Sequence, residues 1–267
     1  MYAPERQAAI AARVGREARV AVSDLALEHS VTTETVRRDL AVLERAGLLR
    51  RVHGGAVSAS VLALPETRVE ERDRVAAEAK DRIAEAALAQ LPPGTASVAL
   101  DAGSTTGRLA GLLATSPGAL VAGAGPLLVV THAVHLAARL ATVPGVELQL
   151  VGGRVRATTQ AAVGAETVRA LEDVRVDVAV LGTNGFSADA GLTTPDAEEA
   201  AVKRALVRCA RRVVVLADAS KAGRTDTHRF ARLEEVDVLV TDAAPDDPVT
   251  APERAALAAA DVEVVQA

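Results

Sequence analysis

Seven short apolar runs alternate with alanine-rich stretches over the last two thirds of the chain, and this alternation limits the fold more than any other feature. The runs cover residues 97–101, 127–131, 147–151, 176–182, 212–218, 237–241 and 262–265. Each run has the length of a strand, and the intervals leave room for crossover helices, so the pattern predicts an α/β domain with a parallel sheet and flanking helices. Nearly continuous apolar runs such as VDVAVLG favour strands buried on both faces.

Small and polar residues follow five of these predicted strands. Because ligands bind at the carboxyl ends of parallel strands, we expect these residues to form one binding site. The segment from Asp101 to Thr106, DAGSTT, places hydroxyl and N–H groups at a helix N-terminus, which is typical of a phosphate cradle. An ordinary capped helix is the alternative. The residues assigned to the site are Asp101, Gly103, Ser104, Thr105, Thr106, Thr131, His132, Gly152, Gly153, Arg154, Gly182, Thr183, Asn184, Gly185, Asp218 and Lys221.

Four residues in this part of the chain allow simpler interpretations. Lys203 is four residues after Glu199 on a predicted helix, so a salt bridge between them is the alternative to a ligand contact. His132 and His135 are too few for a metal site. The single cysteine, Cys209, is predicted to lie in the middle of a helix, buried and inert. No metal and no cofactor are expected.

The first 58 residues have a different pattern, that of a helix-turn-helix. A first helix is predicted over residues 4–16, a short extended piece over 19–22, and a second helix from Ser23, its cap, to His29. Thr32 caps a third helix, in which Val36, Leu40 and Leu43 form an apolar stripe, and Gly47 ends it. Residues 48–58 are predicted to form two short strands, a wing. The sequence therefore predicts a small N-terminal winged helix-turn-helix domain.

The third helix and the wing carry basic and hydroxyl side chains that suit DNA. Residues 1–58 hold nine arginines against seven acidic residues, whereas residues 59–267 have a net charge of −7. A solvated helix face is the alternative interpretation of these arginines. The residues predicted to contact DNA are Ser23, Thr32, Thr33, Thr35, Arg37, Arg38, Arg50, Arg51 and His53.

These patterns divide the chain into residues 1–58, a linker over 59–75, and a larger domain over 76–267. The apolar runs are all far shorter than the roughly 20 residues of a membrane helix, and the N-terminus has no charged-then-apolar signal. We therefore expect a cytoplasmic protein that does not enter a membrane.

Several motifs resemble the DeoR family of bacterial transcriptional regulators. The stretch TVRRDLAVLERAGLLRRVHGGA is similar to the DNA-binding signature of that family. DAGSTT, the GG after a strand, D-x-A-x-L-G-T-N-G, G-L-T-T and A-D-x-S-K resemble its effector domain. That domain is similar to ribose-5-phosphate isomerase and binds phosphorylated sugars or polyols. MYAPERQ and TNGFSADAGLTTPDAEEAAVKRA most resemble members that control operons for fructose uptake and phosphorylation.

The resemblance implies a non-enzymatic repressor of a sugar operon, with fructose as the expected sugar, that is relieved by a sugar phosphate such as fructose 1-phosphate. Its implied partners are operator double-stranded DNA, a phosphorylated sugar and further copies of the chain, in a dimer or tetramer. The alternative is a sugar-phosphate isomerase on the same fold, which would need a carboxylate as general base. The strand end that reads GTNG offers none, although Glu198 or Glu199 could serve.

Overall fold

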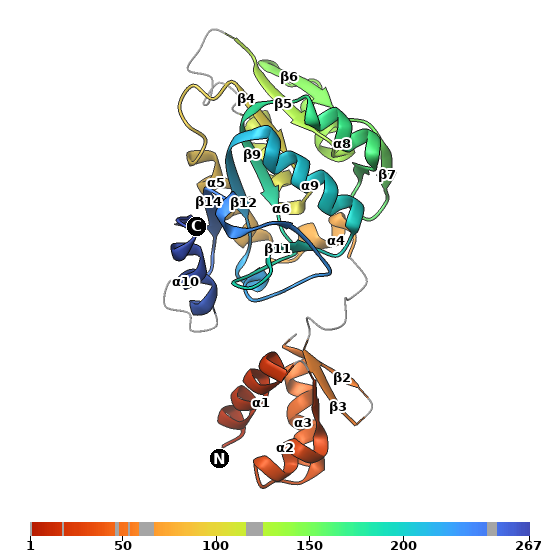
Figure 1. Cartoon of the computed structure of the whole chain (residues 1–267), viewed down its shortest axis with the longest axis vertical. Coiled ribbons are helices and arrows are strands. Elements are labelled where there is room, and N and C mark those ends of the chain that lie inside the picture. Colours follow the sequence, from red (N-terminus) through yellow and green to blue (C-terminus); the bar gives the residue numbers. More distant parts are fainter. Residues whose placement is uncertain are drawn as a thin grey trace. The chain divides into compact units, whose positions relative to one another are not determined.

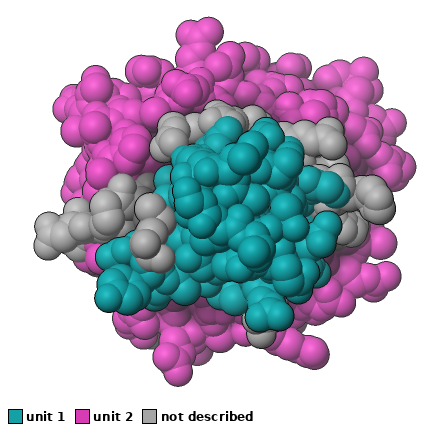
Figure 2. All heavy atoms as spheres, turned by 90° about the horizontal axis from the view of Figure 1, so that it is seen from below, with its two compact units in different colours: residues 1–65 teal, residues 66–267 magenta. Residues whose placement is uncertain are grey.

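The computed structural model describes residues 2–17, 19–45, 48–52, 54–58, 67–115, 125–244 and 250–267. Contacts along the chain divide it into two units, Met1–Pro65 and Glu66–Ala267, which Figure 2 shows in different colours. The units have separate hydrophobic cores, so each is described by itself.

The first unit is a three-helix, three-stranded winged helix within the described residues, as the sequence predicts. Its elements are α1 (Ala3–Glu17), β1 (Arg19–Ala21), α2 (Val22–Glu28), α3 (Thr33–Arg45), β2 (Leu49–Val52) and β3 (Gly55–Ser58). The strands form an antiparallel sheet in the order β1-β3-β2, in which β2 and β3 are the predicted wing (Figure 1). Gly55 is required where β3 meets β1, because a Cβ there would lie 2.1 Å from the carbonyl oxygen of Val20.

The core of this unit comes from the apolar stripe of α3. Val36, Leu40 and Leu43 are buried against Ile10 and Val14 of α1. A buried polar contact joins the same two helices, since Arg6 Nε lies 2.6 Å from Asp39 Oδ2 and Gln7 donates to Asp39 Oδ1 at 2.8 Å. The arrangement leaves the opposite side of α3 exposed.

Two predictions on the caps of these helices have different outcomes. The hydroxyl of Thr32 accepts a hydrogen bond from the backbone N–H of Thr35 at 3.2 Å, which confirms it as the cap of α3. The prediction that Ser23 caps the second helix is wrong. The helix begins at Val22 after Ala21, and the hydroxyl of Ser23 instead donates to Asp24 at 3.1 Å. Gly47 and His53 lie outside the described residues.

The second unit is built around a parallel sheet of seven strands within the described residues. The strands are β4 (Ser97–Leu100), β5 (Leu127–Thr131), β6 (Val146–Leu150), β9 (Val176–Gly182), β12 (Ala210–Leu216), β14 (Val238–Thr241) and β15 (Glu263–Gln266). Their order is β15-β14-β12-β9-β4-β5-β6. Each predicted run forms a strand within two residues of its expected bounds at either end, which confirms the α/β prediction.

Helices cover both faces of this sheet (Figure 1). The helices are α4 (Val69–Arg74), α5 (Ala77–Ala89), α6 (Ser104–Thr115), α7 (Val134–Leu140), α8 (Ala165–Glu172), α9 (Ala197–Cys209) and α10 (Ala251–Ala259), with single 3-10 turns η2 (Ala219–Lys221) and η3 (Leu233–Glu235). Alternate strand residues enter two cores. Val178 and Val180 pack with α5, α6 and α7, whereas Ala179 and Leu181 pack with α8 and α9. None of the described helices is long and apolar enough to cross a membrane.

Four features of this unit differ from the prediction or were missed. The loop expected from Phe186 to Asp196 contains a hairpin of β10 (Gly185–Ser187) and β11 (Gly191–Thr194), which pairs with β13 (His228–Ala231). A second hairpin, β7 (Arg154–Arg156) and β8 (Ala161–Val163), was not predicted. Both consist of strands too short for periodicity to show. The predicted linker contains α4, and Cys209 is the last residue of α9 rather than in its middle.

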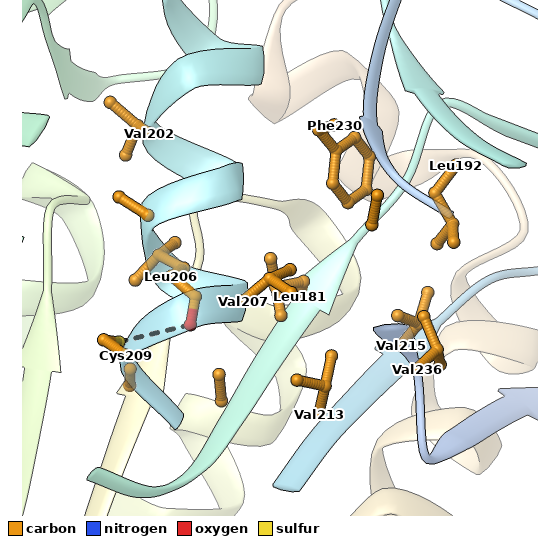
Figure 3. Packing of buried hydrophobic residues seen from close by; sticks show 14 of the residues in the cluster. Leu181, Leu192, Val202, Leu206, Val207, Cys209, Val213, Val215, Phe230 and Val236 are labelled. Atoms are coloured by element: carbon orange, nitrogen blue, oxygen red, sulfur yellow. Dashed lines mark hydrogen bonds between the residues drawn. The ribbon is translucent and has the colours of Figure 1, made fainter. Parts of the chain in front are cut away.

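Figure 3 shows how the end of α9 packs against the sheet. Cys209 is buried, and its Sγ lies 3.2 Å from the carbonyl oxygen of Leu206. Leu181, Val213 and Phe230 lie in the same cluster. Burial raises the pKa of the Cys209 thiol to about 11, and the charge of Arg175 opposes this only in part. The thiol is therefore protonated and unreactive at neutral pH.

Candidate functional site

The order of the strands reverses beside β4. From β4 the chain continues to β5 and β6 on one side, whereas β9, β12, β14 and β15 follow on the other. Loops that leave neighbouring strands in opposite directions open a crevice at the carboxyl edge, which is where ligands bind in such sheets. Asp101 follows β4 and Gly182 ends β9, so both lie at this position.

Asp101 is the centre of a buried polar cluster at the crevice. Its Oδ2 forms an ion pair with Lys203 Nζ of α9 and accepts a hydrogen bond from Gly182 N at 3.0 Å. Lys203 Nζ also donates to the carbonyl oxygen of Gly182 at 2.9 Å and lies 5.2 Å from the ring centroid of Phe230. These contacts tie the ends of β4 and β9 to α9. The alternative in which Lys203 pairs with Glu199 is wrong.

His132, at the end of β5, completes this cluster. Its Nε2 lies 3.2 Å from Asp101 Oδ1 and 3.3 Å from the amide nitrogen of Ala102. Its Nδ1 lies 2.8 Å from the carbonyl oxygen of Ala162 in β8. Asp101, His132 and Lys203 are 1%, 2% and 5% exposed, so they form the floor of the site rather than its surface.

The surroundings of Asp101 determine its charge. Burial opposes ionisation, but the charge of Lys203 and the hydrogen bond with His132 outweigh it and hold the pKa of Asp101 well below its usual value. The carboxylate is therefore ionised at neutral pH and fully engaged. Such a group is a poor general base, which needs a pKa near the working pH and access to a substrate proton.

The predicted phosphate cradle is mostly used by the fold itself. The hydroxyl of Thr106 donates to the carbonyl oxygens of Asp101 at 2.8 Å and Gly103 at 2.9 Å. Thr105 is buried in α6, and Thr131 donates to Leu100 at 2.8 Å. Only Ser104 of the three hydroxyl residues is partly exposed. It lines a cavity of about 570 Å³ together with Gly103, Arg108, His135 and Arg139, among others.

The residues after β6 and β9 are likewise engaged within the chain. A Cβ at Gly153 would lie 2.0 Å from Thr167 Oγ1, so this glycine allows close packing on α8. Thr183 donates to the carbonyl oxygen of Gly185 at 2.7 Å, and Asn184 Oδ1 accepts from Thr194 at 3.2 Å. Gly182, Thr183 and Asn184 are partly exposed at the edge, whereas Gly185 is buried.

Arginines of β7 pair with the acidic first turn of α9. Arg154 contacts Glu198, and Arg156 contacts Glu199 and lies 3.4 Å from Asp196. Glu199 is buried and also accepts from Thr159. Both glutamates that could serve as an isomerase base are therefore paired. Apart from its contact with Glu198, the side chain of Arg154 is exposed, as expected for a residue at the rim of the predicted site.

The loop after β12 contains a half-buried lysine, Lys221, beside the capping residue Asp218. Asp218 caps η2 by accepting from the backbone N–H of Ser220 at 3.1 Å. Among the residues that the structure describes, Lys221 Nζ forms no hydrogen bond or ion pair, although the residue is half-buried. Burial lowers its pKa, the charge of Asp218 raises it, and the charges of Arg224 and Arg72 lower it further. An anion at this position would favour the charged form of Lys221 and so oppose the effects of burial and of the neighbouring arginines.

Three of these residues were not assigned to the site from the sequence. Lys203 was given a local partner, because helical spacing shows neighbours only within the helix. Arg72 and Arg224 lie in segments that were predicted to be linker and loop. The sequence pattern around Arg72 is the charged run ETRVEERDR. Such a run does not show that the helix it forms packs on the α/β unit.

The predicted DNA contacts lie at the start of α3, along α3 and on the wing, except Ser23, which is exposed on α2. Thr33, Arg37 and Arg38 are exposed, and the two arginines lie 3.8 Å and 3.6 Å from Glu34. Arg51 is half-exposed and forms an ion pair with Glu44 at 2.7 Å, which joins the wing to α3. Only the backbone of Arg50 is described. Thr32 and Thr35 share a hydroxyl contact at 2.9 Å at the start of α3.

The geometry thus defines a class of protein, in which a winged helix precedes an α/β unit whose strand order reverses beside β4. The chain matches the family described as "DeoR-like helix-turn-helix domain" over residues 6–61 and the family described as "DeoR C terminal sensor domain" over residues 75–243. The second match covers more than half of the chain. This protein belongs to the DeoR family of transcriptional regulators.

Relatives are similar along nearly the whole chain. FruR of Bacillus subtilis (strain 168), an HTH-type transcriptional regulator, is 33% identical over 91% of this chain and 92% of its own. The glycerol-3-phosphate regulon repressor of Escherichia coli (strain K12) is 30% identical over 92% and 93%. GlpR of Haloferax volcanii, another HTH-type transcriptional regulator, is 38% identical over 78% and 77%. These names place the chain among regulators and not among enzymes.

Ribose 5-phosphate isomerase A of Methanocaldococcus jannaschii is a distant structural neighbour. It is 16% identical, with a TM-score of 0.38 over 53% of this chain and 52% of its own. A similarity at this level carries no functional conclusion. In the part of the chain that the structure describes, no three His, Cys, Asp or Glu side chains are grouped so that they could hold a metal ion.

Proposed function

We propose that this protein represses a sugar-utilisation operon and leaves its operator when a sugar phosphate binds. The observation that carries the proposal is Lys221, a half-buried cation with no described partner, two strands from the crevice beside β4. Fructose 1-phosphate is our first candidate for the effector. The name of one relative, the glycerol-3-phosphate regulon repressor, supports a phosphorylated polyol as the class of ligand.

In this proposal the phosphate lies near Lys221 and the polyol lies over the strand ends. Parallel strands are about 4.8 Å apart, so the ends of β4 and β12, with β9 between them, are about 10 Å apart. That span suits a phosphorylated hexose. Gly182 and Asn184 are the partly exposed groups between them, and the Asp101–Lys203 pair below keeps the loops in place.

DNA binding is assigned to α3 and the wing. Exposed Arg37 and Arg38 at the first turns of α3 suit the major groove, with Thr33 beside them. Arg50, Arg51 and His53 of the wing are proposed to contact phosphates. A dimer or tetramer in the cytoplasm would place two or more copies of α3 on a repeated operator.

In this proposal the oligomer has two forms, and only one of them fits the operator. The effector releases the DNA only if it binds the other form more tightly. A preference of about 3 kcal/mol would change the operator affinity by roughly 100-fold. No contact between effector and DNA is needed, because the two ligands share one conformational equilibrium.

Operator binding titrated with ligands tests the proposal. The full chain is bound to DNA from upstream of the operon next to its gene, and fructose 1-phosphate, fructose 1,6-bisphosphate, glycerol 3-phosphate and fructose are added. We expect a phosphorylated compound, and not free fructose, to release the DNA. If all four leave operator affinity unchanged, the proposed effector class is wrong.

Matched variants sharpen this test. Lys221→Ala is expected to weaken the response to the phosphorylated compound and to leave DNA affinity intact. Arg211→Ala serves as the control, since Arg211 is an exposed cation at the opposite end of β12 with a side chain 86% accessible. An equal response of the Lys221→Ala and Arg211→Ala variants would contradict the role of Lys221.

A further inference from the structure

The edge of the parallel sheet at β6 is open within the described residues. β6 pairs with β5 on one side, and no described strand pairs with its other side (Figure 1). Such edges are usually blocked by a lysine, a proline, a bulge or a very short strand, because free N–H and C=O groups recruit another strand. The sequence of β6, VELQL, contains no lysine and no proline, and all five of its residues pair with β5 in an unbroken register. β6 is therefore an unprotected edge.

The hydrogen bonds with β5 show which backbone groups of β6 are free. The amide of Leu127 donates to the carbonyl oxygen of Gly145 at 2.8 Å, and the amide of Val151 donates to that of Thr131 at 2.8 Å. In a parallel pair the residues of one strand alternate between bonding to the neighbour and facing away from it. Every second residue from Gly145 onward therefore bonds to β5. The residues between them direct their backbone groups outward, and these are Val146, Leu148 and Leu150.

The side chains of β6 form an apolar face and a polar face. Val146 and Leu148 pack against the core that α7 covers, whereas Leu150, on the same face, is 51% exposed. Glu147 and Gln149 are exposed on the other face, and neither side chain has a hydrogen bond or ion pair within the described residues. An additional strand at this edge would cover Leu150 and meet one acidic and one neutral polar side chain.

We propose that β6 pairs with β6 of a second copy of the chain, antiparallel across a two-fold axis at Leu148, so that two sheets join into one. This register pairs all five residues of the strand. It places Val146 opposite Leu150 of the second copy, and Glu147 opposite Gln149. A shift that centres the axis on Glu147 would bring the two copies of this carboxylate together, which is unfavourable because like charges directly opposite each other repel.

The free backbone groups of β6 fit this register. In an antiparallel pair, residues with outward N–H and C=O groups face each other as hydrogen-bonded pairs. Leu148 therefore exchanges two hydrogen bonds with its own copy, and the N–H of Leu150 donates to the C=O of Val146. The N–H of Val146 keeps its bond to Val143, at 3.2 Å. Glu147 and Gln149 form the closer, non-hydrogen-bonded pairs, in which the Cα atoms are about 4.5 Å apart.

The inference deepens the proposed function, because it names the interface of the oligomer on which that function rests. After Leu150 the chain continues into Gly152, Gly153 and Arg154, which were assigned to the ligand site. One strand thus carries both the interface and a loop of the site. A ligand that moves this loop therefore acts on the relative orientation of the two copies.

Two opposite substitutions of Gln149 in the full chain test the pairing. Gln149→Glu places two carboxylates in each close pair, whereas Gln149→Lys places a cation opposite Glu147. We expect the dissociation constant of the dimer, measured by sedimentation equilibrium at about 50 mM salt, to rise about 10-fold for Gln149→Glu and to fall for Gln149→Lys. The same two substitutions of Gln266, which is exposed on the opposite edge strand β15, are the controls and should have no effect.

Disulfide trapping tests the register independently of how tightly the copies associate. A chain with Glu147→Cys and a differently tagged chain with Gln149→Cys are coexpressed and then oxidised. The two new cysteines face each other in the proposed register, at a Cα distance that a disulfide can span. We expect a cross-link between the two chains and none when either chain is expressed alone. Cys209 is buried and does not compete, and its protection from labelling shows that each variant is folded.

The outcomes separate this inference from the proposed function. Opposite responses of the two Gln149 variants, together with the mixed cross-link, support the interface. A monomeric wild type, a cross-link of the Glu147→Cys chain with itself, or a response at Gln266 in place of Gln149 would overturn it. If the copies pair through β6 but no sugar phosphate releases the operator, the proposed function fails and the interface stands. If release occurs and the mixed chains do not cross-link, the interface alone is wrong.

Discussion

Asp101 shows how one buried residue can connect several elements at the end of a sheet. It joins three elements through Lys203, His132 and the backbone of Gly182, all below the surface of the crevice. Removing one partner of a buried ion pair leaves the other charge unpaired in a medium of low polarity. The loops around the crevice therefore depend on this pair.

We predict that Asp101→Asn destabilises the protein by about 3–5 kcal/mol at pH 7. The pKa of Asp101 is lower in the folded chain than in the unfolded chain. Its contribution is thus complete above the unfolded value of about 3.9 and is lost as the pH falls towards the folded value. The difference between the wild type and the variant should shrink by about 1.4 kcal/mol per pH unit below about 3.9.

Urea unfolding at several pH values, followed by circular dichroism, measures this difference. Asp173→Asn is the control, because Asp173 is an exposed carboxylate after α8. A difference for Asp101→Asn that stays constant down to pH 2.5 would show that the ion pair does not set the charge of Asp101.

At the scale of elements, α3 has two sides with different tasks. One side supplies Val36, Leu40 and Leu43 to the core, and Asp39 to the contact with α1. The other side carries Arg37 and Arg38 with side chains that are 61% and 80% exposed. Their contacts with Glu34 are long and exposed, so they add little to stability.

We expect Arg38→Ala to reduce DNA affinity without affecting folding. If Arg38 contacts a phosphate, the slope of log affinity against log salt should become shallower by about 0.9. The unfolding free energy should change by less than about 0.5 kcal/mol. The slope is measured by fluorescence anisotropy with an operator duplex at salt concentrations from about 50 to about 300 mM. Arg211→Ala is the control, and an unchanged slope for Arg38→Ala would contradict a phosphate contact.

At the scale of the whole molecule, the described residues form three hydrophobic cores, one in the first unit and two in the second. The core of the first unit contains Leu40, and the core next to α9 contains Cys209. Because the chain lacks tryptophan and has one cysteine, the Cys209 thiol is a natural reporter on the second unit alone.

We predict that Leu40→Ala destabilises the first unit by about 2–5 kcal/mol and leaves Cys209 protected. The pKa of about 11 and the burial of this thiol make it react slowly with a chromogenic disulfide reagent at pH 8. Leu181→Ala, in the core around Cys209, should accelerate labelling instead. Acceleration by Leu40→Ala of the same size would mean that the two units unfold together.

The local pattern of the sequence determined the elements and the fold class. Periodicity identified α3 and its stripe of Val36, Leu40 and Leu43, since a helix brings residues three and four apart to one face. Continuous apolar runs identified all seven strands of the sheet, because parallel strands are covered on both sides. Three-residue strands such as β7 and β10 gave no signal, because two or three residues cannot show a period.

Only the tertiary structure decided which side chains meet at the crevice. Asp101 and Lys203 are 102 positions apart, and no spacing along the chain could pair them. The hydroxyls of Thr106 and Thr131 were assigned to the ligand site by sequence, yet the fold uses them to hold strand ends. Arg72 affects the charge of Lys221 only because α4 packs on α6 of the same unit. Sequence sets local conformation through neighbouring residues, whereas a binding site depends on distant residues that folding brings together.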